Sequence, residues 1–115
     1  MTIPAIDPDT FEEIHALMEE TMAEFIETYF DNSPRLIETM DQGLVASNSE
    51  TIYQNAHQLK GGSGSIGAIQ LAALAADIEA ISKTGSLEGV ADLLNQLRAE
   101  FGEVEEELRA RASRL

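Results

Sequence analysis

The sequence predicts an all-α protein, an antiparallel up-and-down four-helix bundle with a short additional N-terminal helix. Two observations support this prediction. Apolar residues recur every three or four positions along nearly the whole chain, and no segment shows the period-two alternation or the hairpin turns of β-structure. The 115 residues suffice for one compact domain and not for two, so we expect residues 1–115 to form a single bundle.

The first third of the chain has helical spacing. Its apolar side chains are Phe11, Ile14, Met18, Met22, Phe25, Ile26, Tyr29 and Phe30. Either Asp7 before Pro8, or Thr10 with Glu13, is typical of a capped helix start. Ser33-Pro34 has the form of a fresh N-cap followed by a proline in the first turn, so we expect a break or kink there. The pattern then resumes until residues 47–49.

Three further helices follow. Ser49 begins the first of them, and the second is rich in small residues that allow close packing against its neighbours. Gly85 is the candidate C-cap of that second helix, and Ser86 is the candidate N-cap of the last one. The last helix carries a single apolar stripe, made of Val90, Leu94, Leu97, Phe101, Val104 and Leu108.

The composition limits the possible functions. The chain has 21 acidic and 7 basic residues, and its net charge of −14 repels nucleic acids and anionic membrane surfaces. The absence of cysteine excludes disulfides, thiol catalysis and cysteine-bound metals. The start of the chain does not resemble a signal peptide, and the longest apolar stretch, residues 71–76, is too short to span a bilayer. We expect a cytoplasmic monomer with locally basic partners, and the initiating Met before a complete bundle favours a free-standing protein.

Residues 57–68 read HQLKGGSGSIGA, in which Gly62, Gly64 and Gly67 spell the G-x-G-x-x-G of dinucleotide-binding turns. Such a turn follows a strand, whereas the residues before these glycines are helical by pattern. A P-loop is excluded because its lysine must follow the glycines, and Lys60 precedes them. The kinase glycine loop requires a β-hairpin that this chain lacks. We therefore expect no nucleotide site, and a helix C-cap explains one glycine, Gly64 or Gly67.

The other glycines lie inside the predicted helix, where each costs up to about 1 kcal/mol relative to alanine. At roughly 100° per residue, His57 lies about 140° from the centre of the apolar face and points to solvent. Gly61 and Gly64 fall on the same stripe, and Lys60 is the i+3 neighbour of His57. The apolar face itself is formed by Ile52, Ala56, Leu59 and Ser63. The pattern predicts an exposed imidazole that a large partner can reach.

His15 lies in an acidic, apolar helix without nearby glycines, and we interpret it as an ordinary histidine. Glu12 and His15 form E-x-x-H, a spacing found in di-iron bundles, but Gln54 stands at the matching position before His57. We therefore expect no metal of the protein's own. A metal site stays an alternative that elemental analysis would test.

The segment AHQLKGGSGSIGAIQLAALAADIEAI resembles the active segment of the histidine-containing phosphotransfer (Hpt) family of two-component phosphorelays. The family pattern A-H-x-L-K-G-x-S-x-x-x-G-A is met without gaps by Ala56, His57, Leu59, Lys60, Gly61, Ser63, Gly67 and Ala68. Apolar residues and an acidic residue follow as in the family, namely Leu71, Leu74, Ile78 and Glu79. Gly62 departs from the pattern, because a bulkier or hydroxylated residue is common there.

The resemblance implies a bundle in which a histidine takes a phosphoryl group from an aspartyl phosphate on one receiver domain and passes it to another. Carried over to this chain, His57 is the expected phosphoacceptor, Lys60 stabilises the phosphoryl group, and Glu79 orients the imidazole through Nδ1. The expected access and docking residues are Gly61, Gly64, Ser63 and Gln54. The expected partners are response-regulator receiver domains, which bring Mg²⁺, and a hybrid sensor histidine kinase. The protein is then a carrier, not an enzyme with its own turnover.

Two other interpretations stay open at this point. A phosphate-independent acidic helical adaptor would use the bundle to bind a basic partner and would tolerate the loss of His57. The phosphoacceptor domain of a chemotaxis-type histidine kinase shares H-x-x-K-G but requires an ATP-binding domain, which these 115 residues do not contain. Gly67-Ala68 fits the relay family better.

Overall fold

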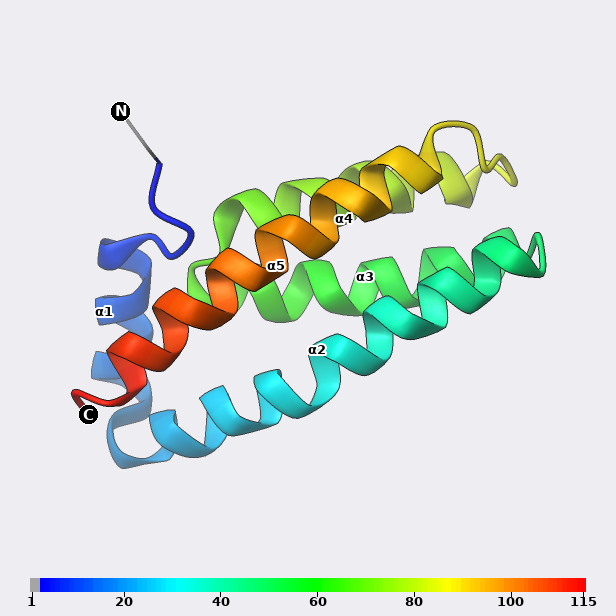
Figure 1. Ribbon diagram of the computed structural model, residues 1–115. Coiled ribbons are helices and arrows are strands. Elements are labelled where there is room, and N and C mark those ends of the chain that lie inside the picture. Colours follow the sequence, from blue (N-terminus) through cyan, green and yellow to red (C-terminus); the bar gives the residue numbers. More distant parts are fainter. Residues whose placement is uncertain (1–2) are drawn as a thin grey trace.

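The computed structural model describes residues 3–115, and their helices run up and down in sequence order (Figure 1). The four long helices, α2 (Met22–Val45), α3 (Ser49–Ile66), α4 (Ile69–Lys83) and α5 (Val90–Ala112), form an antiparallel bundle, and the short helix α1 (Pro8–Met18) packs at one end of it. The predicted all-α bundle with a short additional N-terminal helix is confirmed, and the described residues contain no strand. A 3-10 turn, η1 (Glu19–Thr21), connects α1 to α2.

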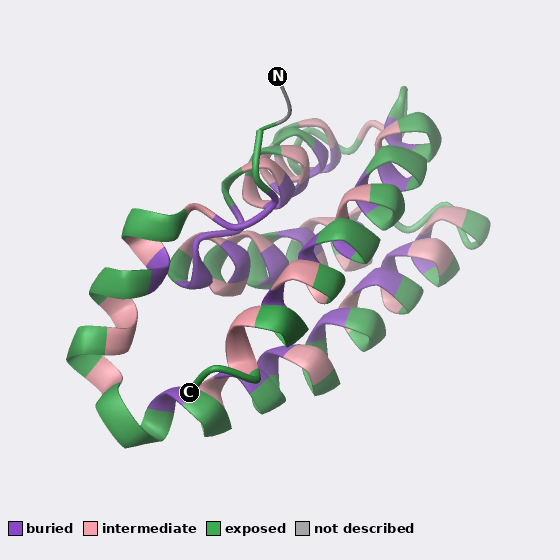
Figure 2. Cartoon of the chain, turned by 60° about the vertical axis from the view of Figure 1, so that its left-hand side comes forward, coloured by how far each residue is buried: buried purple, intermediate pink, exposed green. Residues whose placement is uncertain are grey.

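Each long helix turns one stripe of apolar side chains inward, and Figure 2 shows the buried residues facing one another across the bundle. Within α5, all six residues of the predicted stripe are buried, from Val90 to Leu108. Ile6 and Phe11 extend this core to the end of the bundle that α1 covers. None of the helices in residues 3–115 combines the length and hydropathy needed to cross a membrane.

Of the break or kink predicted at Ser33-Pro34, the break is wrong. Helix α2 continues unbroken from Met22 to Val45 with Pro34 inside it, and the chain bends earlier, at η1. Proline inside a helix costs about 3 kcal/mol because it lacks the N–H that would bind the carbonyl one turn back. Pro34 is exposed, whereas Tyr29 and Ile37 on either side are buried, so packing of the flanking turns holds the helix together.

The helix ends agree with most of the predicted caps. Asp7 caps α1 by accepting a hydrogen bond from the Thr10 N–H at 3.0 Å, and Gly85 follows the end of α4 with a left-handed φ of +87°. Ser86 does not cap the last helix, which corrects the prediction. Its hydroxyl accepts from the Glu88 N–H at 3.1 Å within the loop, and α5 begins only at Val90.

A buried hydrogen bond joins α2 to α3. The hydroxyls of Tyr29 and Ser63 lie 2.8 Å apart, and both residues are buried. Burial raises the pKa of Tyr29 to about 12, although hydrogen bonds from Ser63 and Ser33 oppose this shift. A Cβ added at Gly62 would lie 3.6 Å from the Tyr29 ring, so the α3 backbone also packs closely on this ring. The hydrogen bond and the ring together fix α3 against α2.

The turn between α3 and α4 depends on Gly67. This glycine is the C-cap of α3 with a φ of +94°, and the next residue, Ala68, donates its N–H to the Ser63 carbonyl at 2.8 Å. The Gly67 carbonyl in turn accepts a hydrogen bond from the Asp7 N–H at 2.7 Å. The same glycine therefore ends α3 and anchors the segment that leads into α1.

We predict that Gly67→Ala destabilises the fold by more than Gly85→Ala. Both glycines have left-handed φ values, and a β-carbon in that region costs on the order of 1 kcal/mol. Only at Gly67 would the new Cβ also meet a backbone atom, the Asp7 carbonyl oxygen at 3.1 Å; around Gly85 nothing lies within 4 Å. Urea unfolding of both variants measures the difference. Equal losses of stability would show that the Asp7 contact does not matter.

Candidate functional site

His57 lies in the middle of α3 and points outward, as predicted. Its side chain is 62% exposed, while Ile52, Ala56, Leu59 and Ser63 on the opposite face of the same helix are buried. The helical spacing therefore placed the imidazole correctly. The side chain that contacts the ring belongs to the neighbouring helix, α4.

Glu79 of α4 reaches the ring of His57. Its Oε2 lies 2.6 Å from Nδ1, and the Glu79 side chain is only 14% exposed. The hydrogen bond from Lys60 is the largest cause that lowers the pKa of Glu79, and the hydrogen bond from His57 lowers it further, against the opposing effect of burial. An ionised carboxylate can only accept, so Nδ1 must donate its proton. In the neutral imidazole this hydrogen bond leaves the lone pair on Nε2, the nitrogen that is then available as a nucleophile.

Lys60 binds the same carboxylate. Its Nζ lies 2.5 Å from Oε1 of Glu79, and the lysine side chain is 38% exposed. The sequence placed Lys60 beside His57 on one helix, and the structure adds that Glu79 lies between them. Lys83, the i+4 neighbour of Glu79, instead lies over the Tyr53 ring, with Nζ 5.9 Å from the ring centroid.

The candidate access residues do not all lie on one surface. Gly61 is exposed, and a Cβ added there would have no neighbour within 4 Å. Gly64 is half-buried on the side that faces α4, where an added Cβ would make an ordinary contact 4.0 Å from that of Ala72. Ser63 is fully buried and cannot contact a partner, which corrects that part of the prediction. Gln54 is exposed, with its side-chain amide 3.4 Å from Glu50.

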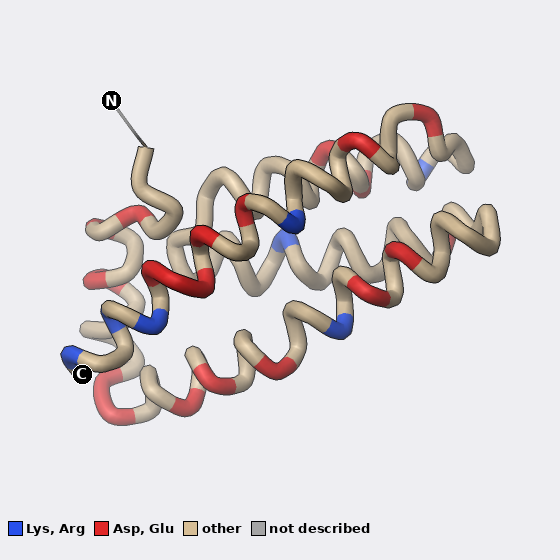
Figure 3. The backbone as a smooth tube through the Cα atoms, viewed as in Figure 1, with Lys and Arg blue, Asp and Glu red and all other residues tan. Residues whose placement is uncertain are grey.

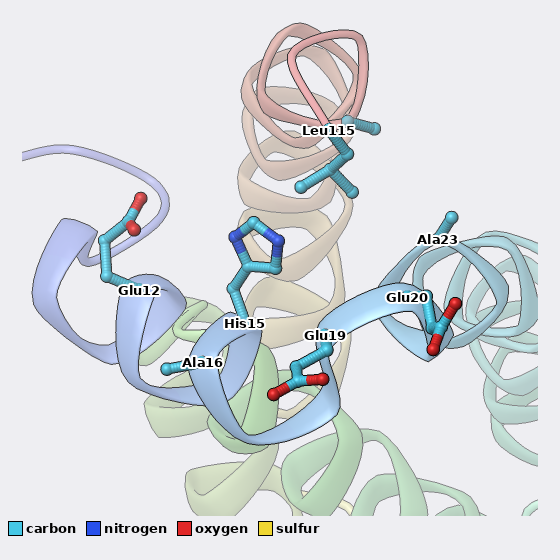
Figure 4. A pocket seen from close by; sticks show the side chains of 8 residues that line it. Glu12, His15, Ala16, Glu19, Glu20, Ala23 and Leu115 are labelled. Carbon is cyan, nitrogen blue, oxygen red and sulfur yellow. The ribbon is translucent and has the colours of Figure 1, made fainter.

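His15 lies elsewhere, in a hollow between α1, η1 and the end of α5 (Figure 4). Its ring packs against Phe11 with 6.4 Å between the centroids. Figure 4 shows the carboxylates of Glu12, Glu19 and Glu20 spread around the imidazole and not gathered on it. Across residues 3–115, no group of three or more His, Asp or Glu side chains is arranged to hold a metal ion.

The geometry around His57 agrees with the comparison of the whole sequence with known families. The family model described as "Hpt domain" matches residues 24–107, which is most of the chain. The chain belongs to the Hpt domain family. Members of this family are histidine phosphotransfer carriers of phosphorelays, which work with receiver domains and histidine kinases, and this Hpt protein is such a carrier.

Two individual proteins illustrate the relationship. The chain is 29% identical over 106 residues to histidine-containing phosphotransfer protein 4 of Arabidopsis thaliana, a match that covers 87% of this chain and 84% of the plant protein. The crystal structure of histidine-containing phosphotransfer protein B (HptB) from Pseudomonas aeruginosa PAO1 superimposes with a TM-score of 0.93. That match covers 99% of both chains at 24% identity, so it establishes a shared fold.

We predict that Glu79→Gln weakens the preference of His57 for the Nδ1–H tautomer by about fivefold to tenfold. A hydrogen bond to a charged acceptor is worth about 1 kcal/mol more than one to a neutral amide, and only the ionised acid excludes the opposite tautomer. The ¹⁵N chemical shifts of the two ring nitrogens report the populations. Asp77→Asn, an exposed change on the same helix, is the control and should leave the shifts unchanged. An unaltered tautomer ratio in Glu79→Gln would contradict the prediction.

Proposed function

We propose that His57 is the phosphoacceptor of this Hpt protein and that Nε2 is the atom that reacts. The observation that carries the proposal is the 2.6 Å contact between Nδ1 and Glu79 on an imidazole whose side chain is 62% exposed. The contact holds the ring in one orientation and one tautomer, and the exposure allows a partner to reach the other nitrogen. A neutral imidazole is already nucleophilic near neutral pH, so no separate general base is required.

The proposed reaction needs no proton transfer at the reacting atom. The Nε2 lone pair attacks the phosphorus of an aspartyl phosphate on a receiver domain, a P–N bond forms, and the P–O bond to the aspartyl carboxylate breaks. The proton stays on Nδ1, so the ring becomes positively charged while it faces the carboxylate of Glu79. Attack by the aspartate of a second receiver reverses these steps. Phosphoryl transfer depends mainly on positioning and on charge neutralisation, and both requirements match what this site offers.

Lys60 is proposed to stabilise the phosphoryl group without taking part in bond making. An ammonium group has three donors, so Lys60 can keep its contact with Glu79 and still donate to a phosphoryl oxygen. Because it is partly exposed, its contribution is on the order of 1 kcal/mol. We propose that the receiver supplies the Mg²⁺ and that this chain has neither a nucleotide site nor turnover of its own. The glycines of G-x-G-x-x-G lie within and at the end of α3, and the element directly before α3 is the helix α2 and not a strand, which supports this proposal.

We predict that His57→Gln abolishes phosphoryl transfer while the helix content stays unchanged. The test mixes the protein with a set of ³²P-labelled receiver domains and follows label that is acid-labile and alkali-stable. His15→Gln is the control and should be labelled like the unaltered protein. Label that survives in His57→Gln would contradict the assignment of His57 as the phosphoacceptor. A partner that binds both the unaltered protein and His57→Gln, with no phosphoryl transfer to either, would favour the adaptor interpretation.

We predict that Gly61→Gln slows transfer at least about tenfold, because a side chain there would stand beside His57 on the exposed stripe. The substitution should not harm the fold, since replacing an exposed helical glycine stabilises a helix by up to about 1 kcal/mol. Gly102→Gln is a matched control, because Gly102 is also exposed within a helix with no atom within 4 Å of its would-be Cβ. Transfer at equal rates in the two variants would show that bulk at Gly61 does not limit access.

A further inference from the structure

A groove of about 520 Å³ lies between α4 and α5. Each helix lines it with one stripe of side chains at spacings of three, four and seven residues, so the groove follows the two helices for about two turns, or roughly 10 Å. Both stripes have the same order: a glutamine, an exposed alanine, a half-buried residue and an acid. The lining residues are Gln70, Ala73, Leu74 and Asp77 from α4 and Gln96, Ala99, Glu100 and Glu103 from α5.

The charged side chains of this groove are all acidic. None of the described residues that line it is Lys or Arg. Arg98 belongs to the same part of α5 but points toward α2, where it pairs with Asp41 at 2.9 Å. Asp77, Glu100 and Glu103 make no ion pair within the described part of the chain. Figure 3 shows how acidic residues recur along α5.

Glu100 has a buried carboxylate oxygen without a partner. Its Oε2 is almost inaccessible to solvent and has no hydrogen-bond donor among the described residues. Burial is the largest cause that raises the pKa of Glu100, and the carboxylates of Glu103 and Glu107 raise it further. A buried acceptor that lacks a donor costs stability. A cationic donor that enters the groove would remove this cost and would also face Glu103.

The groove offers apolar surface beside its acids, from Leu74, Ala73 and Ala99. Arg and Lys match this combination, because their aliphatic stems cover apolar surface while the charged end reaches a carboxylate. A helix is the backbone shape that fits, since its own side chains at i, i+3, i+4 and i+7 pack along a straight groove between two helices. A second copy of this chain fits poorly, because it would bring the same three acids against those of the first.

The groove and the His57 site lie on opposite sides of α4. At roughly 100° per residue, Glu79 is about 170° around α4 from the middle of the stripe that lines the groove. Glu79 contacts His57 on α3, whereas the stripe faces α5. A partner in the groove therefore leaves the exposed edge of the imidazole open.

We infer that the α4–α5 groove binds an amphipathic helix of a protein partner, which places an Arg or Lys side chain on Glu100 and further cations on Asp77 and Glu103. This surface is separate from the imidazole that phosphoryl transfer uses, so such a partner and a receiver domain bind at the same time. A carrier held in this way stays close to its partner, which raises the local concentration of the imidazole there. The inference does not require that His57 reacts.

The probe is a capped, alanine-based helical peptide of about 20 residues with Arg at i, i+3 and i+7 on one face. In ¹⁵N NMR titrations at low salt we expect saturable binding, with the largest amide shifts in residues 70–77 and 96–103. The same peptide with uncharged citrulline in place of Arg should bind at least about tenfold more weakly. No saturable binding of the Arg peptide, or shifts centred on another surface, would overturn the inference.

Two variants test the groove itself. Ala99→Trp fills it from an exposed position, and Glu100→Gln/Glu103→Gln removes two of its charges. Each should weaken binding of the Arg peptide at least about tenfold. Glu100→Gln alone should not lower the melting temperature at neutral pH, because burial and the neighbouring carboxylates disfavour the charged form of this acid. A lowered melting temperature would contradict the assignment of Glu100 as an unpartnered acid kept for binding.

The matched controls lie in the second acidic hollow, beside His15. Ala16→Trp adds the same bulk at an exposed alanine, and Glu12→Gln/Glu19→Gln removes the same number of charges. Both should bind the Arg peptide like the unaltered protein. Equal losses in test and control variants would show that the peptide responds only to net charge, and the inference would then fail.

This inference and the proposed function fail in different ways. His57→Gln should bind the Arg peptide normally, and a receiver should label the unaltered protein equally fast with the peptide bound. Slower labelling would show that the groove overlaps the surface used by the receiver, against the inference. If no receiver labels His57 while the peptide binds as expected, only the proposed function fails. Self-association that Ala99→Trp abolishes would assign the groove to a second copy of the chain and rule out the inferred partner.

Discussion

The left-handed turn at Gly67 reverses the chain between α3 and α4 and lets these helices run side by side at close range. Gly64 faces Ala72 across this contact, so small residues on both helices lie opposite each other. This closeness is what brings the carboxylate of Glu79 within hydrogen-bonding distance of both His57 and Lys60. A wider spacing would leave Glu79 as a surface charge and His57 as a freely rotating exposed ring. The site thus depends on backbone packing as much as on its polar groups.

The helical spacing predicted the fold class and the inward faces well, because burial of an amphipathic helix is encoded turn by turn in the sequence. It failed where tertiary packing outweighs local preference. Pro34 looks like a helix start, yet the buried residues around it keep α2 continuous. Ser86 looks like an N-cap, yet its hydroxyl serves the loop before α5. Neither outcome can be predicted from the sequence without knowing which helix surfaces pack against one another.

The features of the site likewise fall into those that helical spacing predicts and those that depend on how the helices pack together. The orientation of His57 and the open backbone at Gly61 follow from helical geometry within one segment, and both were predictable. Glu79 was a residue of the motif, but its contact with the ring depends on the packing of α4 against α3. Ser63 was misplaced at the docking surface although its position on the apolar face indicated burial. Tyr29, 34 residues earlier, was predicted to face the core, but its hydrogen bond with Ser63 had no signal in the local pattern.

The hydrogen bond between Glu79 and Nδ1 also bears on how a carrier stays reversible. If His57 is the acceptor, the same proton sits on the ring before and after transfer, so neither direction has to wait for exchange with water. The cationic phosphorylated ring would then face the carboxylate of Glu79, which offsets part of its charge. The relative amounts of phosphorylated receivers then decide which way the group flows. Such a carrier can pass phosphoryl groups in either direction, and the direction depends on its partner proteins and not on the carrier itself.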